Sequence, residues 1–154
     1  MRFRDAGHIL GSAIIELWLD DGSNQAKVVF SGDLGQTAQP IIRDPSRIEA
    51  ADFLIVESTY GGRRHENSGK KLEFLERVIM EADRSGGKLI IPSFAVGRTQ
   101  DLLYHIKSLR MEGRIPPLPV YIDSPMAISA TETFKKNPMY YDDETHRLLR
   151  SEEH

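Results

Sequence analysis

The stretch SAIIELWLDDGSNQAKVVFSG (residues 12–32) predicts a β-hairpin and sets the character of the first part of the chain. Residues 12–19 alternate imperfectly between apolar and polar side chains, and residues 26–32 form a β-branched run that ends in glycine. Between them, DDGSN at residues 20–24 has the composition of a tight turn. A third apolar run, ADFLIVES at residues 51–58, is typical of a strand that is buried on both faces.

From about residue 66 the apolar period changes from that of strands to that of helices. The pattern predicts amphipathic helices within residues 68–87, 97–113 and 125–136, and a further helix start after residue 142. Short apolar runs separate these helices, namely KLIIPSF (88–94) and PVYIDS (119–124). Strands that alternate with helices in this way predict an α/β fold with parallel βαβ units.

The composition restricts the class of protein. The chain has 154 residues, which suits one compact domain or parts of two. No apolar run approaches the length of about 18 residues that a membrane span needs, and no signal peptide is evident, so we expect a cytoplasmic protein. The chain has no cysteine, so a metal site would use His, Asp and Glu. The net charge of −3 argues against a basic coat for nucleic acid.

Two residues stand in glycine-rich turns beside predicted strands. His8 lies in DAGHILG, after a charged opening segment that we expect to be a loop, and Asp33 lies in FSGDLG. A carboxylate in such a turn can bridge two cations, because each oxygen can bind one. The alternative is that Asp33 only forms the turn and that His8 has a structural or surface role. The five histidines include no HxH or HxxxH pair, so the chain has no local chelate.

Polar residues also follow the other predicted strands. Ser93, Arg98 and Ser124 lie where these strands end and helices begin, a place where open α/β sheets bind ligands and helix N-termini favour anions. We therefore consider them possible contacts for a substrate phosphate. The alternative is that the serines only cap helices.

Five segments together resemble a known family. DAGHILGSA, FSGDLG, ESTYGG, PSFAVGRTQDLL and YIDSPMAISATETF, in this order, closely resemble the β-CASP family of metallo-β-lactamase-fold RNA hydrolases, which includes the cleavage and polyadenylation endonuclease. The resemblance implies that residues 1–60 are a partial metallo-β-lactamase domain. Residues 61–154 would be the N-terminal part of a β-CASP domain with a Rossmann-like parallel βαβ arrangement.

The resemblance also implies roles for residues. His8 would be a zinc ligand, Asp33 the carboxylate that bridges two zinc ions, and Glu57 an acidic residue that supports the catalytic centre. The implied reaction is zinc-dependent hydrolysis of an RNA phosphodiester. The chain lacks the family's HxHxDH motif and its later histidine motifs, so we expect a fragment that binds no zinc and is inactive alone.

Two alternatives remain open at this point. The parent protein could be a non-catalytic β-CASP scaffold subunit of an RNA-processing complex, or a hydrolase of the same fold that acts on another substrate. A fold cut within its sheet also predicts bare apolar faces, and hence self-association through residues 1–60. The exposed side chains would include Ile14, Leu17, Val28, Val29 and Phe30.

Overall fold

The computed structural model describes residues 1–62 and 70–150, and it divides the chain into two compact units. Unit 1 combines residues 1–63 with residues 137–154, and unit 2 comprises residues 64–136. The C-terminal segment is therefore packed with the N-terminal part of the chain. The boundary expected after residue 60 separates domains that are defined by sequence, whereas the two units are defined by packing. The boundary therefore stays a prediction.

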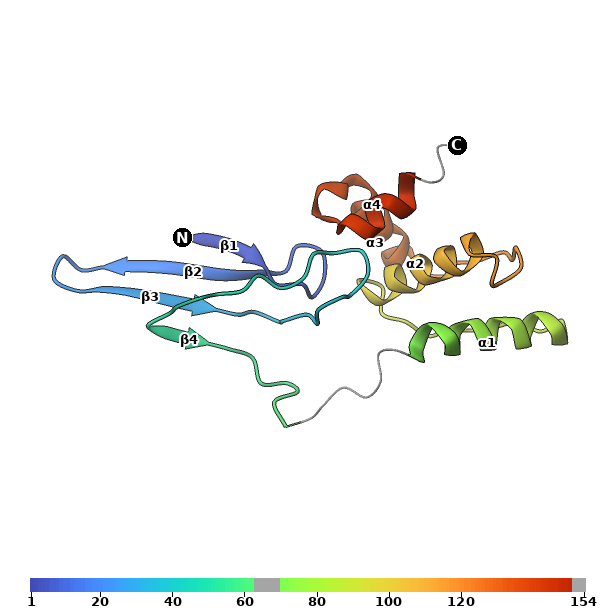
Figure 1. Cartoon of the computed structure of the whole chain (residues 1–154), viewed down its shortest axis with the longest axis horizontal. Helices are drawn as coiled ribbons and strands as arrows, with labels where there is room; N and C mark the ends of the chain where they lie inside the picture. Colours follow the sequence, from blue (N-terminus) through green and yellow to red (C-terminus); the bar gives the residue numbers. More distant parts are fainter. Residues whose placement is uncertain (63–69, 151–154) are drawn as a thin grey trace. The chain divides into compact units, whose positions relative to one another are not determined.

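A mixed four-stranded sheet forms most of unit 1 (Figure 1). Its strands are β1 (Arg2–Asp5), β2 (Ala13–Asp20), β3 (Gln25–Phe30) and β4 (Phe53–Ile55), in the order β1-β2-β3-β4. β2 is antiparallel to both β1 and β3, and β4 is parallel to β3. Consequently β1, β3 and β4 all run in one direction, and their carboxyl ends lie at the same edge of the sheet.

The predicted hairpin is confirmed as β2 and β3. Its turn is closed by two aspartates, whose side chains accept backbone N–H groups. Gly22 N donates to Asp20 Oδ1 at 2.7 Å, and Asn24 N donates to Asp21 Oδ1 at 2.7 Å. These bonds hold the pKa of both carboxyl groups below the ordinary value of 3.8, since they stabilise the charged form.

Two predictions about strands are wrong. The opening segment is not a loop, because Arg2–Asp5 pairs with β2 as a strand. The run at residues 51–58 is not a strand buried on both faces: β4 covers three residues, and Phe53 and Leu54 are each 61% exposed. β4 has a neighbour on one side alone among the described strands, so the backbone groups on its other side lack a strand partner.

One buried carboxylate connects the first three strands. Glu16 on β2 is 2% exposed and accepts hydrogen-bonded ion pairs from Lys27 Nζ at 2.6 Å and Arg4 Nε at 3.1 Å. Arg2 Nη1 lies 3.9 Å away. The Lys27 bond is the main reason why the pKa of Glu16 lies below its ordinary value of 4.5, with Arg4 adding to the effect against the cost of desolvation.

The two faces of the sheet differ in burial. On one face Ile14 and Val29 pack with Ala6 and the partly buried Ile48 in a small core. The predicted exposure of Ile14 and Val29 is therefore wrong. The opposite face carries five large apolar side chains that are exposed, namely Phe3, Leu19, Phe30, Phe53 and Ile55.

The helices of unit 2 confirm the predicted pattern. They are α1 (Lys71–Ser85), α2 (Arg98–Met111) and α3 (Pro125–Lys136). α1 ends at Gly86, which adopts the left-handed conformation at φ 64° that glycine accommodates without strain. The helical stripes meet in a core formed by Leu75, Ile79, Leu109 and Ile115.

The predicted parallel pairing of residues 88–94 with 119–124 is wrong. Neither segment belongs to a strand, and unit 2 has no strand among its described residues. Ile90 is 85% exposed and Tyr121 is 87% exposed. Parallel strands are stable where further strands and covering helices bury both faces, and these side chains lack such cover.

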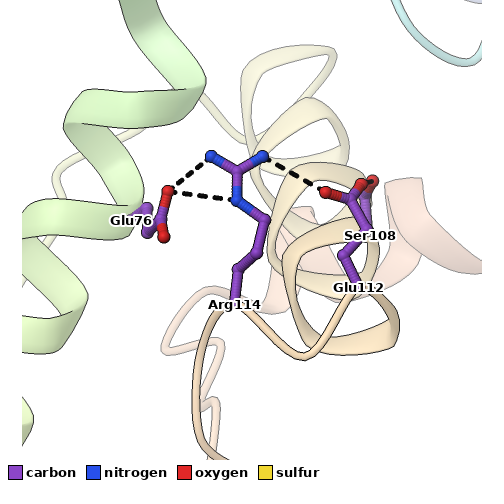
Figure 2. A network of polar contacts seen from close by, with 4 residues as sticks. All are labelled: Glu76, Ser108, Glu112 and Arg114. Atoms are coloured by element: carbon purple, nitrogen blue, oxygen red, sulfur yellow. Dashed lines mark hydrogen bonds and ion pairs between the residues drawn. The ribbon is translucent and has the colours of Figure 1, made fainter.

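A polar network connects the turn after α2 to α1 (Figure 2). The Arg114 guanidinium donates from Nε to Glu76 Oε2 at 3.1 Å, and its Nη2 also contacts this oxygen. On its other side Nη1 donates to Glu112 Oε2 at 3.2 Å, and Ser108 Oγ donates to Glu112 Oε1 at 2.8 Å. These bonds lower the pKa of Glu112, with the Ser108 hydroxyl as the largest cause. The network fixes the chain direction as it leaves α2.

After unit 2 the chain re-enters unit 1. A short 3₁₀ helix (Pro138–Tyr140) leads to α4 (Asp143–Arg150), which confirms the helix expected in this region. Asp142 Oδ1 caps α4 by accepting the N–H of Thr145 at 2.6 Å. No helix in residues 1–62 or 70–150 has the length and apolar character to cross a membrane.

The buried carboxylate leads to a prediction about pH. The folded-state pKa of Glu16 is lowered, so its contribution to stability is full above pH 4.5 and is lost as the pH falls through the folded value. We expect Glu16→Gln to unfold at a lower urea concentration at pH 7 and to lose less stability on acidification than the unchanged chain. Fluorescence of Trp18, the single tryptophan, reports the transition because Lys27 lies 5.5 Å from its ring. Exposed Glu49→Gln is the control, and equal acid sensitivity of Glu16→Gln and the unchanged chain would contradict the prediction.

Candidate active site

Three of the predicted site residues follow the three strands that end at one edge of the sheet. His8 comes after β1, Asp33 after β3 and Glu57 after β4. Because these strands run in one direction, their following loops lie at the same end of unit 1. The sheet topology therefore brings together residues that are distant in sequence.

The loops of His8 and Asp33 are in direct backbone contact. Gly35 N donates to the carbonyl of Ala6 at 2.9 Å. A Cβ on Gly35 would lie 1.4 Å from the carbonyl oxygen of Gly7, and a Cβ on Gly7 would lie 2.4 Å from Cδ of Pro45. The two glycines thus allow an approach that any side chain would prevent.

Glu57 connects these loops from the third strand. Its Oε1 accepts the N–H of Leu34 at 2.7 Å, and its own N–H donates to Ser31 Oγ at 3.2 Å. The Leu34 bond is the main reason why the pKa of Glu57 is lowered, followed by the Thr59 hydroxyl, and the positive charge of His8 adds to them. Glu57 therefore remains a carboxylate that holds the turn next to Asp33.

His8 and Asp33 supply donors of the kind that zinc prefers, an imidazole nitrogen and a carboxylate. Both residues are exposed, and the backbone N–H of His8 is held by Ser12 Oγ at 3.2 Å. The described parts of the chain contain no group of three His, Cys, Asp or Glu side chains that could hold a metal ion. The donor types therefore fit zinc, although a zinc site takes three or four protein ligands and these are two.

The other candidates belong to unit 2, and each has a local partner. Ser124 Oγ accepts the N–H of Ala127 at 3.2 Å and so caps α3, and Ser93 Oγ donates to Phe94 O at 3.5 Å. Arg98 begins α2, and its Nη1 lies 3.9 Å from Asp101 Oδ2. The capping interpretation accounts for the structural role of Ser124, while the side chain of Arg98 is largely exposed.

Two contributors to this site were missed in the sequence. Ser31 is buried, accepts the N–H of Glu57 and donates to the carbonyl of Gly32 at 2.6 Å. Gly35 makes the close backbone contact described above. The signal was present in the second glycine of GDLG, since two glycines around one aspartate exceed what a simple turn requires.

Several known proteins are similar in sequence to most of this chain. Residues 99–154 match the model of the Beta-Casp domain. Over 149 residues the chain is 37% identical to Ribonuclease TTHA0252 of Thermus thermophilus. The aligned stretch covers 94% of this chain and 32% of the relative. It is 36% identical over 138 residues to an RNase J-like protein of Methanocaldococcus jannaschii, covering 86% of this chain and 31% of the relative. A transcription termination factor, FttA of Methanothermobacter thermautotrophicus, is 36% identical over 126 residues, or 80% of this chain and 20% of the relative.

The chain therefore belongs to the β-CASP family, a family of RNA-processing nucleases. The resemblance expected from the five sequence motifs is confirmed. The chain spans about a third or less of the length of these relatives.

The glycine contact can be tested by adding one methyl group. Gly35→Ala would place its Cβ inside the carbonyl of Gly7, so we expect a loss of about 1–3 kcal/mol or more in the free energy of unfolding of unit 1. Gly62→Ala is the control, because nothing lies within 4 Å of its Cβ position, and its effect should stay within about 0.5 kcal/mol. Urea unfolding followed by Trp18 fluorescence measures both. Equal stability of the two variants would show that the two loops do not approach in this way.

Proposed function

We propose that this chain is part of a zinc-dependent nuclease that hydrolyses RNA phosphodiester bonds. The observation that carries the proposal is the convergence of His8, Asp33 and Glu57 at one edge of the sheet, in a member of the β-CASP family. The relatives named as ribonucleases support RNA as the substrate. A longer protein would complete the ligand set, in keeping with the greater length of the relatives.

In this proposal each of the three residues has a distinct task. His8 would hold a metal ion through an imidazole nitrogen, and Asp33 would supply carboxylate oxygens to the same centre. Bound zinc would lower the pKa of a bound water to about 7 and so provide hydroxide for attack on phosphorus. Glu57 acts on the Asp33 turn, since its carboxylate accepts the N–H of Leu34.

The proposal extends to the domains and to substrate contacts. Residues 1–60 would contribute to a metallo-β-lactamase domain and residues 61–154 to a β-CASP domain. Arg98 would contact a phosphate of the RNA, because its side chain is 62% exposed at the start of α2. Ser93 and Ser124 would add hydroxyl donors near other helix starts.

A chimaera tests the function. In this chimaera the present chain replaces the matching third of the Thermus thermophilus ribonuclease, and the rest of that ribonuclease is kept. We expect the chimaera to cleave single-stranded RNA in the presence of zinc, and Asp33→Asn to reduce cleavage by about 100-fold or more, because even residues that only support metal ligands are worth about 10–100-fold. Cleavage of a labelled RNA on denaturing gels gives the rate.

The matched control is Asp143→Asn, an exposed aspartate in the first turn of α4, which should leave cleavage unchanged. A folded, zinc-loaded chimaera that does not cleave RNA would favour the scaffold alternative, and cleavage of another ester in place of RNA would favour a different hydrolase. The 154-residue chain alone should show no cleavage and no stoichiometric zinc binding below micromolar concentrations in calorimetry.

We further propose that this chain self-associates through the exposed apolar face of unit 1. The argument is the five exposed side chains on one face of the sheet, together with β4, which is open to solvent. Light scattering should show masses above the monomer value of 17.4 kDa that grow with concentration. Phe53→Lys should shift the chain towards the monomer, whereas Phe74→Lys on α1 should not. A strictly monomeric unchanged chain would contradict this expectation.

A further inference from the structure

A strained turn lies in the loop that follows Asp33. Ile41 has a φ of 80°, and Ile42 N donates to the carbonyl of Pro40 at 3.0 Å. This is a γ-turn with positive φ at its central residue, the rare and strained form of this turn. For a β-branched residue such a φ is a true outlier, and it persists where the surrounding structure over-determines it.

Residues 139–142 supply the contacts that hold this turn. Asp142 N donates to the carbonyl of Ile41 at 2.9 Å, and Tyr141 forms an antiparallel bridge with Ile42. Ile41 and Tyr141 are each 7% exposed. The strained residue is thus fixed through its carbonyl, through its neighbour and through the burial of its side chain.

Arg43 links the same segment to the strand that leads to His8. Its Nη2 donates to the carbonyl of Met139 at 2.7 Å, and its Nη1 lies 3.8 Å from Asp5 Oδ2. Asp5 is the last residue of β1, and its carbonyl accepts the N–H of Ser46 at 2.8 Å. One guanidinium therefore bridges residues that are nearly a whole chain apart in sequence.

The loop from Asp33 to Arg43 is anchored at two points. Near its start Gly35 donates to Ala6, and at its end Arg43 pairs with Asp5. Both anchors fall on adjacent residues directly before Gly7 and His8. The position of the Asp33 loop relative to the His8 loop is consequently set at both ends, and the second anchor depends on residues 139–142.

We propose that Arg43 is a positioning residue through which residues 139–142, part of the matched Beta-Casp region, hold the Asp33 loop against the His8 loop. The ligand role of Asp33 and His8 rests on the proposed function, but the coupling itself does not. A movement of the 139–142 segment releases the strained turn at Ile41 and loosens the contact between the two loops. The end of the β-CASP region thereby controls the geometry of the candidate metal ligands.

Amide hydrogen exchange of the 154-residue chain, resolved by NMR, tests the coupling without RNA or metal. In Arg43→Ala we expect the amides of Asp142 and Gly35 to exchange about tenfold faster or more, because each donates one of the hydrogen bonds that the coupling protects. The β2–β3 amides serve as an internal reference and should keep their rates. Arg43→Lys, which retains the charge but reaches one partner at a time, should give intermediate rates.

The control is Arg47→Ala, an exposed arginine in the same loop, which should leave all these rates unchanged. If the Asp142 amide exchanges faster but the exchange rate of the Gly35 amide is unchanged, the proposal is overturned. Residues 139–142 would then not influence the Asp33 loop. A uniform increase that includes the β2–β3 amides would also overturn it, since Arg43 would then contribute only to global stability. A failure of RNA cleavage in the chimaera leaves these exchange rates unaffected, so the two proposals fail independently.

Discussion

The ion pairs of Glu16 hold β1 and β3 against β2, and the place where the His8 loop emerges depends on the pairing of β1. A buried carboxylate is costly unless cations meet it, and here Arg4 comes from β1 and Lys27 from β3. A shift of β1 by one residue would turn Arg2 and Arg4 to the opposite face of the sheet and leave the charge of Glu16 poorly compensated. With β1 held antiparallel to β2, the loop of His8 emerges at the same edge as the loop of Asp33.

At that edge the chain relies on backbone groups more than on side chains. Gly7 and Gly35 permit two loops to meet through main-chain atoms, and the Leu34 N–H binds the carboxylate of Glu57. Backbone N–H and C=O groups have little conformational freedom once the strands are formed. They therefore hold the segments that carry His8 and Asp33 at low entropic cost. His8 and Asp33 remain exposed and able to bind a ligand, while their backbones are fixed.

The C-terminal segment matches one domain by sequence and packs with a different part of the chain. Residues 99–154 match a single domain model, yet residues 137–150 pack with the N-terminal sheet unit. Tyr141 is buried there, and Asp142 both caps α4 and donates its N–H to Ile41. The segment therefore belongs to the Beta-Casp match by sequence and to unit 1 by packing.

The sequence by itself determined the features that depend on local physics. The hairpin of β2 and β3 followed from alternation and from the two aspartates of its turn, and α1 followed from its apolar stripe and Gly86. The motifs around His8 and Asp33 identified the family and marked the residues that the sheet later brought to one edge. These elements are encoded within a few residues of chain, so their patterns could be interpreted directly.

The tertiary structure alone decided the features that require a distant partner. Arg2–Asp5 resembles a charged loop until Glu16 and β2 are placed beside it, and residues 88–94 resemble a buried strand although no strand lies beside them in the described chain. The positive φ of Ile41 likewise has no local signal, because it exists only where Tyr141 and Asp142 hold it. Strand pairing and strain depend on hydrogen-bond partners far away in the chain, and local periodicity carries no information about them.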